Sequence, residues 1–144
     1  MRAVLRDEEG STLLLTIFYG FLSLVLILLV VAASSLYLER KRLFTLADGA
    51  ALVGAEAFDL TDVTVTSSGP RPVLDSVDVA AAVRAYVAST PSSFQSLAID
   101  RAETVDGRSA TVTLSAFWRP PIVSLLVPEG IPIEVTAVAR SVFD

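Results

Sequence analysis

The sequence predicts an α+β fold: a long N-terminal transmembrane helix that continues into a small domain of antiparallel strands with one packed helix. Three observations lead to this fold class. No charged residue occurs between Gly10 and Leu38. Residues 22–48 contain neither glycine nor proline, so a helix that begins in the apolar stretch can continue beyond it. Apolar and polar residues alternate in the second half of the chain, as in strands with one buried face.

The apolar stretch is long enough to cross a membrane. As a helix, Leu13 to Leu38 would be about 39 Å long, whereas the hydrocarbon core of a bilayer is about 30 Å thick. Leucine, isoleucine, valine and phenylalanine dominate the stretch, and each favours insertion at the helix centre by about 0.3–0.6 kcal/mol. We therefore expect a single-pass protein of the cell membrane, in contact with membrane lipid, with a short N-terminal segment at 1–10 and the transmembrane helix at 11–38.

A cleaved secretory signal is the competing interpretation of this stretch. The small residues at 32–35 would suit a signal peptidase. However, the acidic residues 7–9 outweigh Arg2 and Arg6, although a signal peptide needs positive charge there. The stretch also exceeds the roughly 7–15 apolar residues of a signal core. Cleavage near Ala33 would release a secreted small α+β binding domain, which is the alternative function.

A face of mostly small residues follows the membrane stretch at helical spacing. Small residues allow another helix to approach closely, as in pairs of membrane helices. The same face would also suit packing on the chain's own soluble domain, and the sequence leaves both interpretations open. We expect a continuing amphipathic helix at 39–58. The helix-packing face begins in the last turn of the membrane stretch. It consists of Leu36, Leu43, Ala47, Ala50, Gly54 and Ala57.

The small α+β soluble domain is expected at 59–144 and begins with a strand. Val63 and Val65 alternate there with polar residues. Residues 67–72 are rich in serine, glycine and proline, which predicts a turn-rich connection.

A second helix is expected from Ser76 or Val77 to Ser89. Asp75 or Ser76 can cap its first turn, and Thr90-Pro91 ends it. Its apolar stripe consists of Val79, Val83, Tyr86 and Val87.

Two strands then flank Asp106-Gly107, a pair that suits a two-residue type I′ hairpin. The strand after the turn has one apolar face, and prolines at 120–121 stop it. A last strand is expected from Ile131 to Phe143, and Pro132 near its start indicates a sheet edge. The expected buried face after the turn consists of Ala110, Val112, Leu114, Ala116 and Trp118.

The apolar run Ile122–Val127 has two interpretations. It can be a patch that touches a partner or the membrane, or it can fill the edge of the core beneath the sheet.

The composition argues against several classes of function. The chain lacks histidine and cysteine, which removes the commonest general base and the nitrogen and sulfur metal ligands. It contains no glycine-rich phosphate loop, and its net charge of −5 is unsuited to nucleic acid. Asp100, Glu103 and Asp106 fit no calcium-loop pattern and are expected to be solvated charges. We expect no enzyme, cofactor, small-molecule substrate or nucleic-acid partner.

Three motifs carry a family resemblance. Gly10-Ser11-Thr12 precedes the apolar run, Tyr37-Leu38-Glu39-Arg40-Lys41-Arg42-Leu43 follows it, and Leu46-Ala47-Asp48-Gly49-Ala50-Ala51-Leu52-Val53-Gly54-Ala55 comes next. Together they resemble the N-terminal region of TadE/TadG-type proteins of the Tad (tight adherence, Flp-type) pilus-assembly family. The resemblance implies a pseudopilin-like, membrane-anchored structural or assembly component of a Tad-type pilus or secretion apparatus at the cell surface. Its partners would be other pilus or secretion subunits, through hetero- or homo-oligomeric helix packing and subunit docking.

The resemblance also bears on processing and orientation. Gly10 and Ser11 form the possible processing site. Prepilin-like members carry a glutamate five residues after the glycine, whereas Leu15 occupies that position here. The chain is therefore closer to the TadG-like variety, whose members need not be processed. The resemblance implies a cytoplasmic N-terminus and an extracytoplasmic position for residues 39–144.

Overall fold

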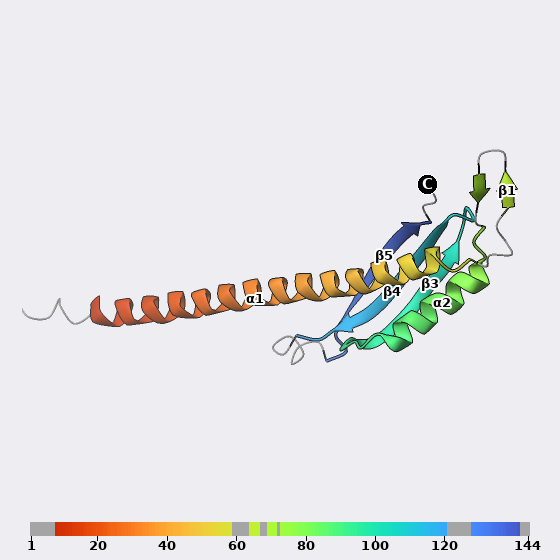
Figure 1. Cartoon of the computed structure of the whole chain (residues 1–144). Coiled ribbons are helices and arrows are strands. Elements are labelled where there is room, and N and C mark those ends of the chain that lie inside the picture. Colours follow the sequence, from red (N-terminus) through yellow and green to blue (C-terminus); the bar gives the residue numbers. More distant parts are fainter. Residues whose placement is uncertain (1–7, 59–63, 67–68, 72, 121–127, 142–144) are drawn as a thin grey trace, which may run out of the picture. The chain divides into compact units, whose positions relative to one another are not determined.

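The computed structural model describes residues 8–58, 64–66, 69–71, 73–120 and 128–141 (Figure 1). The chain divides into two compact units, Met1–Leu36 and Tyr37–Asp144, called unit 1 and unit 2 below. A long apolar helix, a second helix and antiparallel strands confirm the α+β class. The elements in chain order are α1 (Glu8–Ala55), β1 (Thr64–Thr66), β2 (Gly69–Arg71), α2 (Ser76–Ser89), β3 (Gln95–Thr104), β4 (Ser109–Trp118) and β5 (Ile131–Arg140).

The main sheet of unit 2 is antiparallel, with the strand order β3-β4-β5. Strand β5 is an edge strand of this sheet, and its Pro132 lies opposite Phe117. The predicted edge position is therefore confirmed. A proline suits an edge strand because it has no N–H to donate to a further neighbouring strand. The predicted strand end at Phe143 lies outside the described residues, and the described strand ends at Arg140.

A second, two-stranded sheet corrects one prediction. Residues 69–71, expected in a turn-rich connection, form β2 and pair antiparallel with β1, with Pro70 opposite Val65. The serine, glycine and proline content of residues 67–72 is typical of a connection. The backbone pairing shows that a short strand occupies the second half of it.

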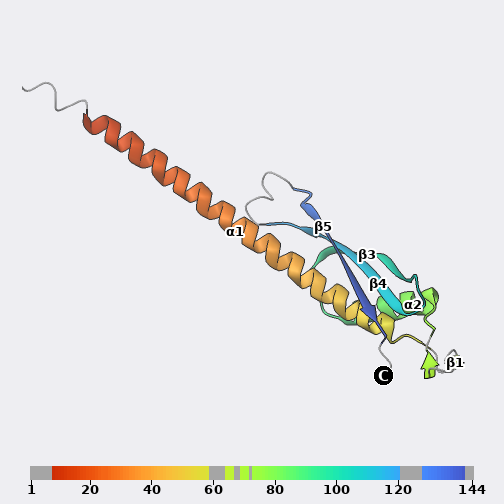
Figure 2. The ribbon, with the colours of Figure 1, turned by 90° about the horizontal axis from the view of Figure 1, so that it is seen from above.

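The core of unit 2 lies between one face of the main sheet and the helices. All five residues predicted for the buried face of β4 are buried. Burial of each leucine or valine contributes about 1.5–3 kcal/mol to stability. Figures 1 and 2 show the last turns of α1 and all of α2 beside the sheet. The core residues from the helices include Leu43, Leu46, Ala47, Ala50, Ala51, Ala55, Val79 and Val83, and those from β5 are Ile133, Val135 and Ala137.

Helix α2 has the bounds that the sequence predicts. Asp75 is its N-cap, and its carboxylate accepts a hydrogen bond of 2.7 Å from the backbone N–H of Val77. At the other end, the backbone N–H of Thr90 donates to the carbonyl of Tyr86. Of the predicted stripe, Val79 and Val83 are buried, whereas Tyr86 and Val87 are partly exposed.

The connection between β3 and β4 is not the predicted type I′ turn. That turn needs positive φ at both central residues, but only Gly107 has one, at 67°. Strand β3 ends at Thr104 and strand β4 begins at Ser109, so the loop is longer than two residues. The carboxylate of Asp106 accepts from the backbone N–H groups of Arg108 and Ser109, at 2.9 and 2.7 Å. These bonds hold the wider loop.

Candidate interaction surfaces

The described part of unit 1 is a helix with an apolar surface. No residue of α1 from 12 to 36 is buried, and the leucine, isoleucine, valine and phenylalanine side chains between 13 and 27 are largely exposed. Soluble proteins rarely expose apolar patches of more than a few hundred Å². This surface therefore needs an apolar environment, and the helix is a candidate single membrane span.

The backbone and polar groups of this helix suit lipid. In a helix, backbone N–H and C=O groups are paired within the segment, which is the condition for crossing a bilayer. The hydroxyl of Thr16 also donates a hydrogen bond of 2.8 Å to the carbonyl of Thr12. This bond satisfies the Thr16 donor within the helix, so the hydroxyl needs no water.

The predicted helix-packing face lies mainly inside unit 2. Leu43, Ala47, Ala50 and Gly54 are buried, whereas Leu36, in unit 1, and Ala57 are partly exposed. The buried members thus pack on the chain's own domain, which is one of the two interpretations left open. Packing of this face against another subunit stays a prediction.

Gly54 shows how closely the elements of unit 2 approach this face. A Cβ atom at Gly54 would lie 3.1 Å from Cβ of Ala110, 3.2 Å from Cγ1 of Val79 and 3.3 Å from Cγ2 of Val83. Strand β4 and helix α2 therefore meet α1 at this point. A side chain here would need these neighbours to move.

The possible processing site and the acidic residues of the hairpin lie in different elements. Gly10 and Ser11 lie in the first turns of α1, and processing there stays a prediction. Nε of Arg101 lies 3.6 Å from Oε1 of Glu103, and the Asp106 carboxylate holds its own loop. Those loop bonds, the one from the Arg108 N–H first, lower the pKa of Asp106. Within the described residues, no group of three acidic side chains is placed to hold a metal ion.

Unit 2 carries grooves beside α1 that the sequence did not predict. One, of about 400 Å³, is lined by Arg42 and Leu46 of α1, by Tyr86 of α2 and by residues 90–94. Another, of about 360 Å³, lies on a different side of α1, where β5 contributes Val135 and Thr136. No local pattern in the sequence links these β5 residues to α1. The run Ile122–Val127, predicted as a patch or as a core edge, lies outside the described residues.

The open face of the sheet is mostly polar. Oγ1 of Thr113 and Oγ1 of Thr136 lie 3.0 Å apart across β4 and β5. Beside them, Asp100, Arg101 and Glu134 line a shallow groove of about 290 Å³. Charges of both signs meet here, so this groove has no clear preference for an anion or a cation.

These features define an α+β protein with an apolar N-terminal helix. The model of the Tad family, described as "Putative Flp pilus-assembly TadE/G-like", matches residues 10–57. The resemblance inferred from the sequence motifs is thereby confirmed over these residues. No curated protein and no solved structure matches the chain. The matched region and the apolar helix fit a pilus-associated component, and the family is one of pilus assembly rather than of enzymes.

Proposed function

We propose that this chain is a single-pass, membrane-anchored, pilin-like component of a Tad-type pilus or secretion apparatus. The coincidence of two features carries the proposal. The family match covers residues 10–57, and the same residues include a candidate membrane-spanning helix with no buried side chain from 12 to 36. A pilus-assembly protein with such a helix needs a lipid or protein environment to cover it.

The chain would act through contacts rather than chemistry. Unit 1 would hold the protein in the bilayer and pack laterally against helices of other subunits. Unit 2 would lie outside the cytoplasm and dock on other pilus or secretion subunits. Much of the face at 43–54 is already used within unit 2. Lateral packing in the membrane would therefore rely on residues that precede it.

Two measurements test the anchor. Membranes from expressing cells are washed at alkaline pH, and the N-terminus of the retained protein is sequenced. An anchored protein stays in the membrane fraction and begins at its original start or at Ser11. Recovery in the aqueous fraction with a start near residues 33–36 would instead establish the secreted alternative.

Orientation requires a separate test. A reporter fused after Asp144, active only on one side of the membrane, distinguishes the two topologies. We expect activity on the extracytoplasmic side. Activity on the cytoplasmic side would refute docking at the cell surface.

A further inference from the structure

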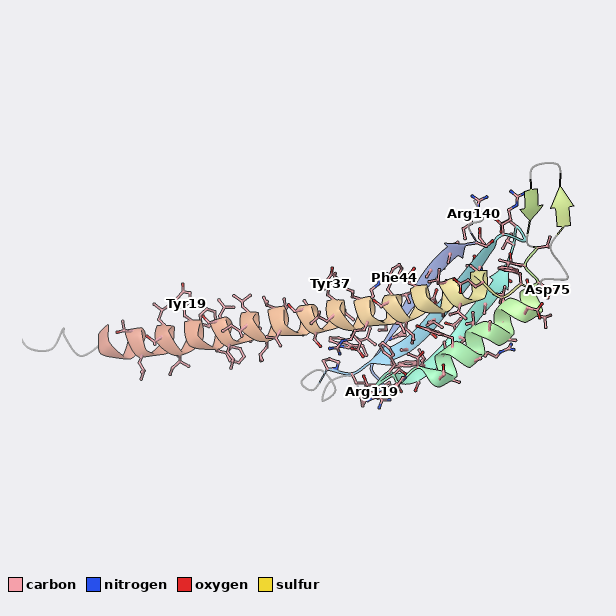
Figure 3. All side chains as sticks on the ribbon, viewed as in Figure 1. Tyr19, Tyr37, Phe44, Asp75, Arg119 and Arg140 are labelled. Carbon is pink, nitrogen blue, oxygen red and sulfur yellow. The ribbon has the colours of Figure 1, made fainter. Side chains whose placement is uncertain are left out.

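Four residues of α1 form one side of a groove on unit 2. Tyr37, Arg40, Lys41 and Phe44 are spaced at i, i+3, i+4 and i+7, so they share one helix face. Figure 3 labels Tyr37 and Phe44 along the same side of α1. With Val135 and Thr136 of β5, these residues line the groove of about 360 Å³, called the collar groove below.

The collar groove is cationic. Arg40 and Lys41 are both exposed, and among the described residues no carboxylate lines this groove. The neighbouring Glu39 is directed elsewhere, because its Oε2 lies 3.7 Å from Nη1 of Arg42. Arg42 itself lines the other groove, with Tyr86. The charges of Arg40 and Lys41 are thus left available for an anion.

The lining also offers apolar surface beside these charges. Tyr37 is 66% exposed and Phe44 is 46% exposed, so both rings can contact a ligand. Tyrosine is enriched where a membrane meets water, because its ring is apolar and its hydroxyl is polar. Tyr37 also directly follows the apolar helix of unit 1 in the chain. A ligand that combines a negative group with hydrocarbon fits this lining best.

We propose that the collar groove binds the headgroup of an anionic phospholipid. The Arg40 guanidinium and the Lys41 ammonium would bind phosphate oxygens, while the Tyr37 and Phe44 rings would contact the glycerol and the upper acyl chain. This inference rests on the membrane anchorage proposed above. It adds a defined lipid site to a region that would otherwise act only as a general positive charge.

The test uses the full chain in lipid nanodiscs that contain equal parts phosphatidylglycerol and phosphatidylcholine. Native mass spectrometry of the released protein counts the lipids of each class that stay bound. We expect an excess of phosphatidylglycerol on the wild-type protein. Arg40→Gln and Lys41→Gln should each reduce that excess about fivefold, which is the effect of one basic residue at an anionic membrane surface.

Arg84→Gln is the matched control, because it removes the same charge from an exposed position of α2 that lines neither groove. It should leave the lipid excess unchanged. An equal loss in all three variants would show general charge attraction and overturn the proposal. So would the absence of any excess on the wild type.

Two further arms separate other ligands from the lipid headgroup. In the first arm, the protein is placed in nanodiscs of phosphatidylcholine alone. Inorganic phosphate, added at the same concentration as the lipid headgroups, should not bind to the protein. Binding of phosphate there would make the groove a free-anion site and overturn the proposal. In the second arm, subunits that co-purify with Arg40→Gln are compared with those of the wild type. Their loss with an unchanged lipid excess would make the collar groove a contact site for protein and overturn the proposal. A chain that does not enter nanodiscs would refute the anchor itself, which is a different result from entry without lipid preference.

Discussion

The two parts of helix α1 both carry apolar residues, but their surroundings differ. From 12 to 36 the helix carries large, branched and aromatic side chains, and none is buried. From 43 to 55 the buried face consists mostly of alanine and glycine, and Leu43 and Ala50 have no exposed surface. Fluid hydrocarbon can adapt to bulky side chains, whereas a folded sheet and helix come close only over small ones. Side-chain size therefore distinguishes the buried face of the second part from the exposed surface of the first.

The largest expected effect tests the buried part. Leu43→Ala should lower the free energy of unfolding of unit 2 by about 2–5 kcal/mol, because a fully buried leucine leaves a cavity. Urea unfolding of the full chain in detergent, followed by the fluorescence of the single tryptophan, Trp118, measures it. Leu26→Ala should leave this transition unchanged. Equal effects of the two variants would contradict the distinction.

Two leucines with equal exposure sharpen the comparison. Leu26 is 54% exposed and Leu52 is 55% exposed, but we place Leu26 in lipid and Leu52 in water. Leu26→Arg should disfavour insertion by about 3 kcal/mol and reduce the fraction of protein that resists alkaline extraction from membranes. Leu52→Arg should leave that fraction unchanged. The proposed span fails if both variants remain in the membrane equally well.

Two glycines give a smaller contrast. Gly54→Val should destabilise unit 2 by about 1–3 kcal/mol through overpacking, since a Cβ there already meets three side-chain atoms. A Cβ at Gly20 has no atom within 4 Å, so Gly20→Val should leave the unfolding of unit 2 unchanged. If unit 1 packs against other subunits near Gly20, the same variant should reduce their co-purification. Unaltered recovery of partners would place the packing elsewhere on the helix.

The smallest expected effect is a pH dependence confined to unit 2. The N–H groups of Arg108 and Ser109 lower the pKa of Asp106 below its ordinary value of about 3.9. A lowered carboxyl pKa stabilises the fold above the unfolded-state value, and this contribution disappears as the pH falls through the folded-state pKa. The unfolding free energy of the wild type should therefore decrease more steeply below pH 4 than that of Asp106→Asn. Parallel pH profiles would contradict it.

Features set by neighbouring residues were predicted well. The ends of α2, at Asp75 and Thr90, could be predicted because capping bonds join residues only a few positions apart. The alternation of β4 placed its buried face correctly, since successive side chains of a strand point to opposite faces. The turn at Asp106-Gly107 was predicted wrongly. The pair allows a type I′ turn, but the side-chain bonds of Asp106 stabilise a wider loop instead.

The candidate surfaces were predicted less completely. The spacing of Leu43, Ala47, Ala50 and Gly54 identified one helix face, but spacing does not reveal what the face contacts. The collar groove needs Val135 and Thr136, which are far from Arg40 in the sequence. Only the folded chain brings β5 beside α1, so the groove had no local signal.

By itself, the sequence determined the class of fold, the apolar helix, the capped ends of α2 and the resemblance to the Tad family. Each of these depends on composition or on interactions between residues close along the chain. The tertiary structure decided that most of the small-residue face is buried within unit 2, with β4 and α2 against Gly54, and that a cationic groove lies between α1 and β5. Those outcomes depend on packing between distant segments, where the closeness of approach follows from the whole core and not from any single motif.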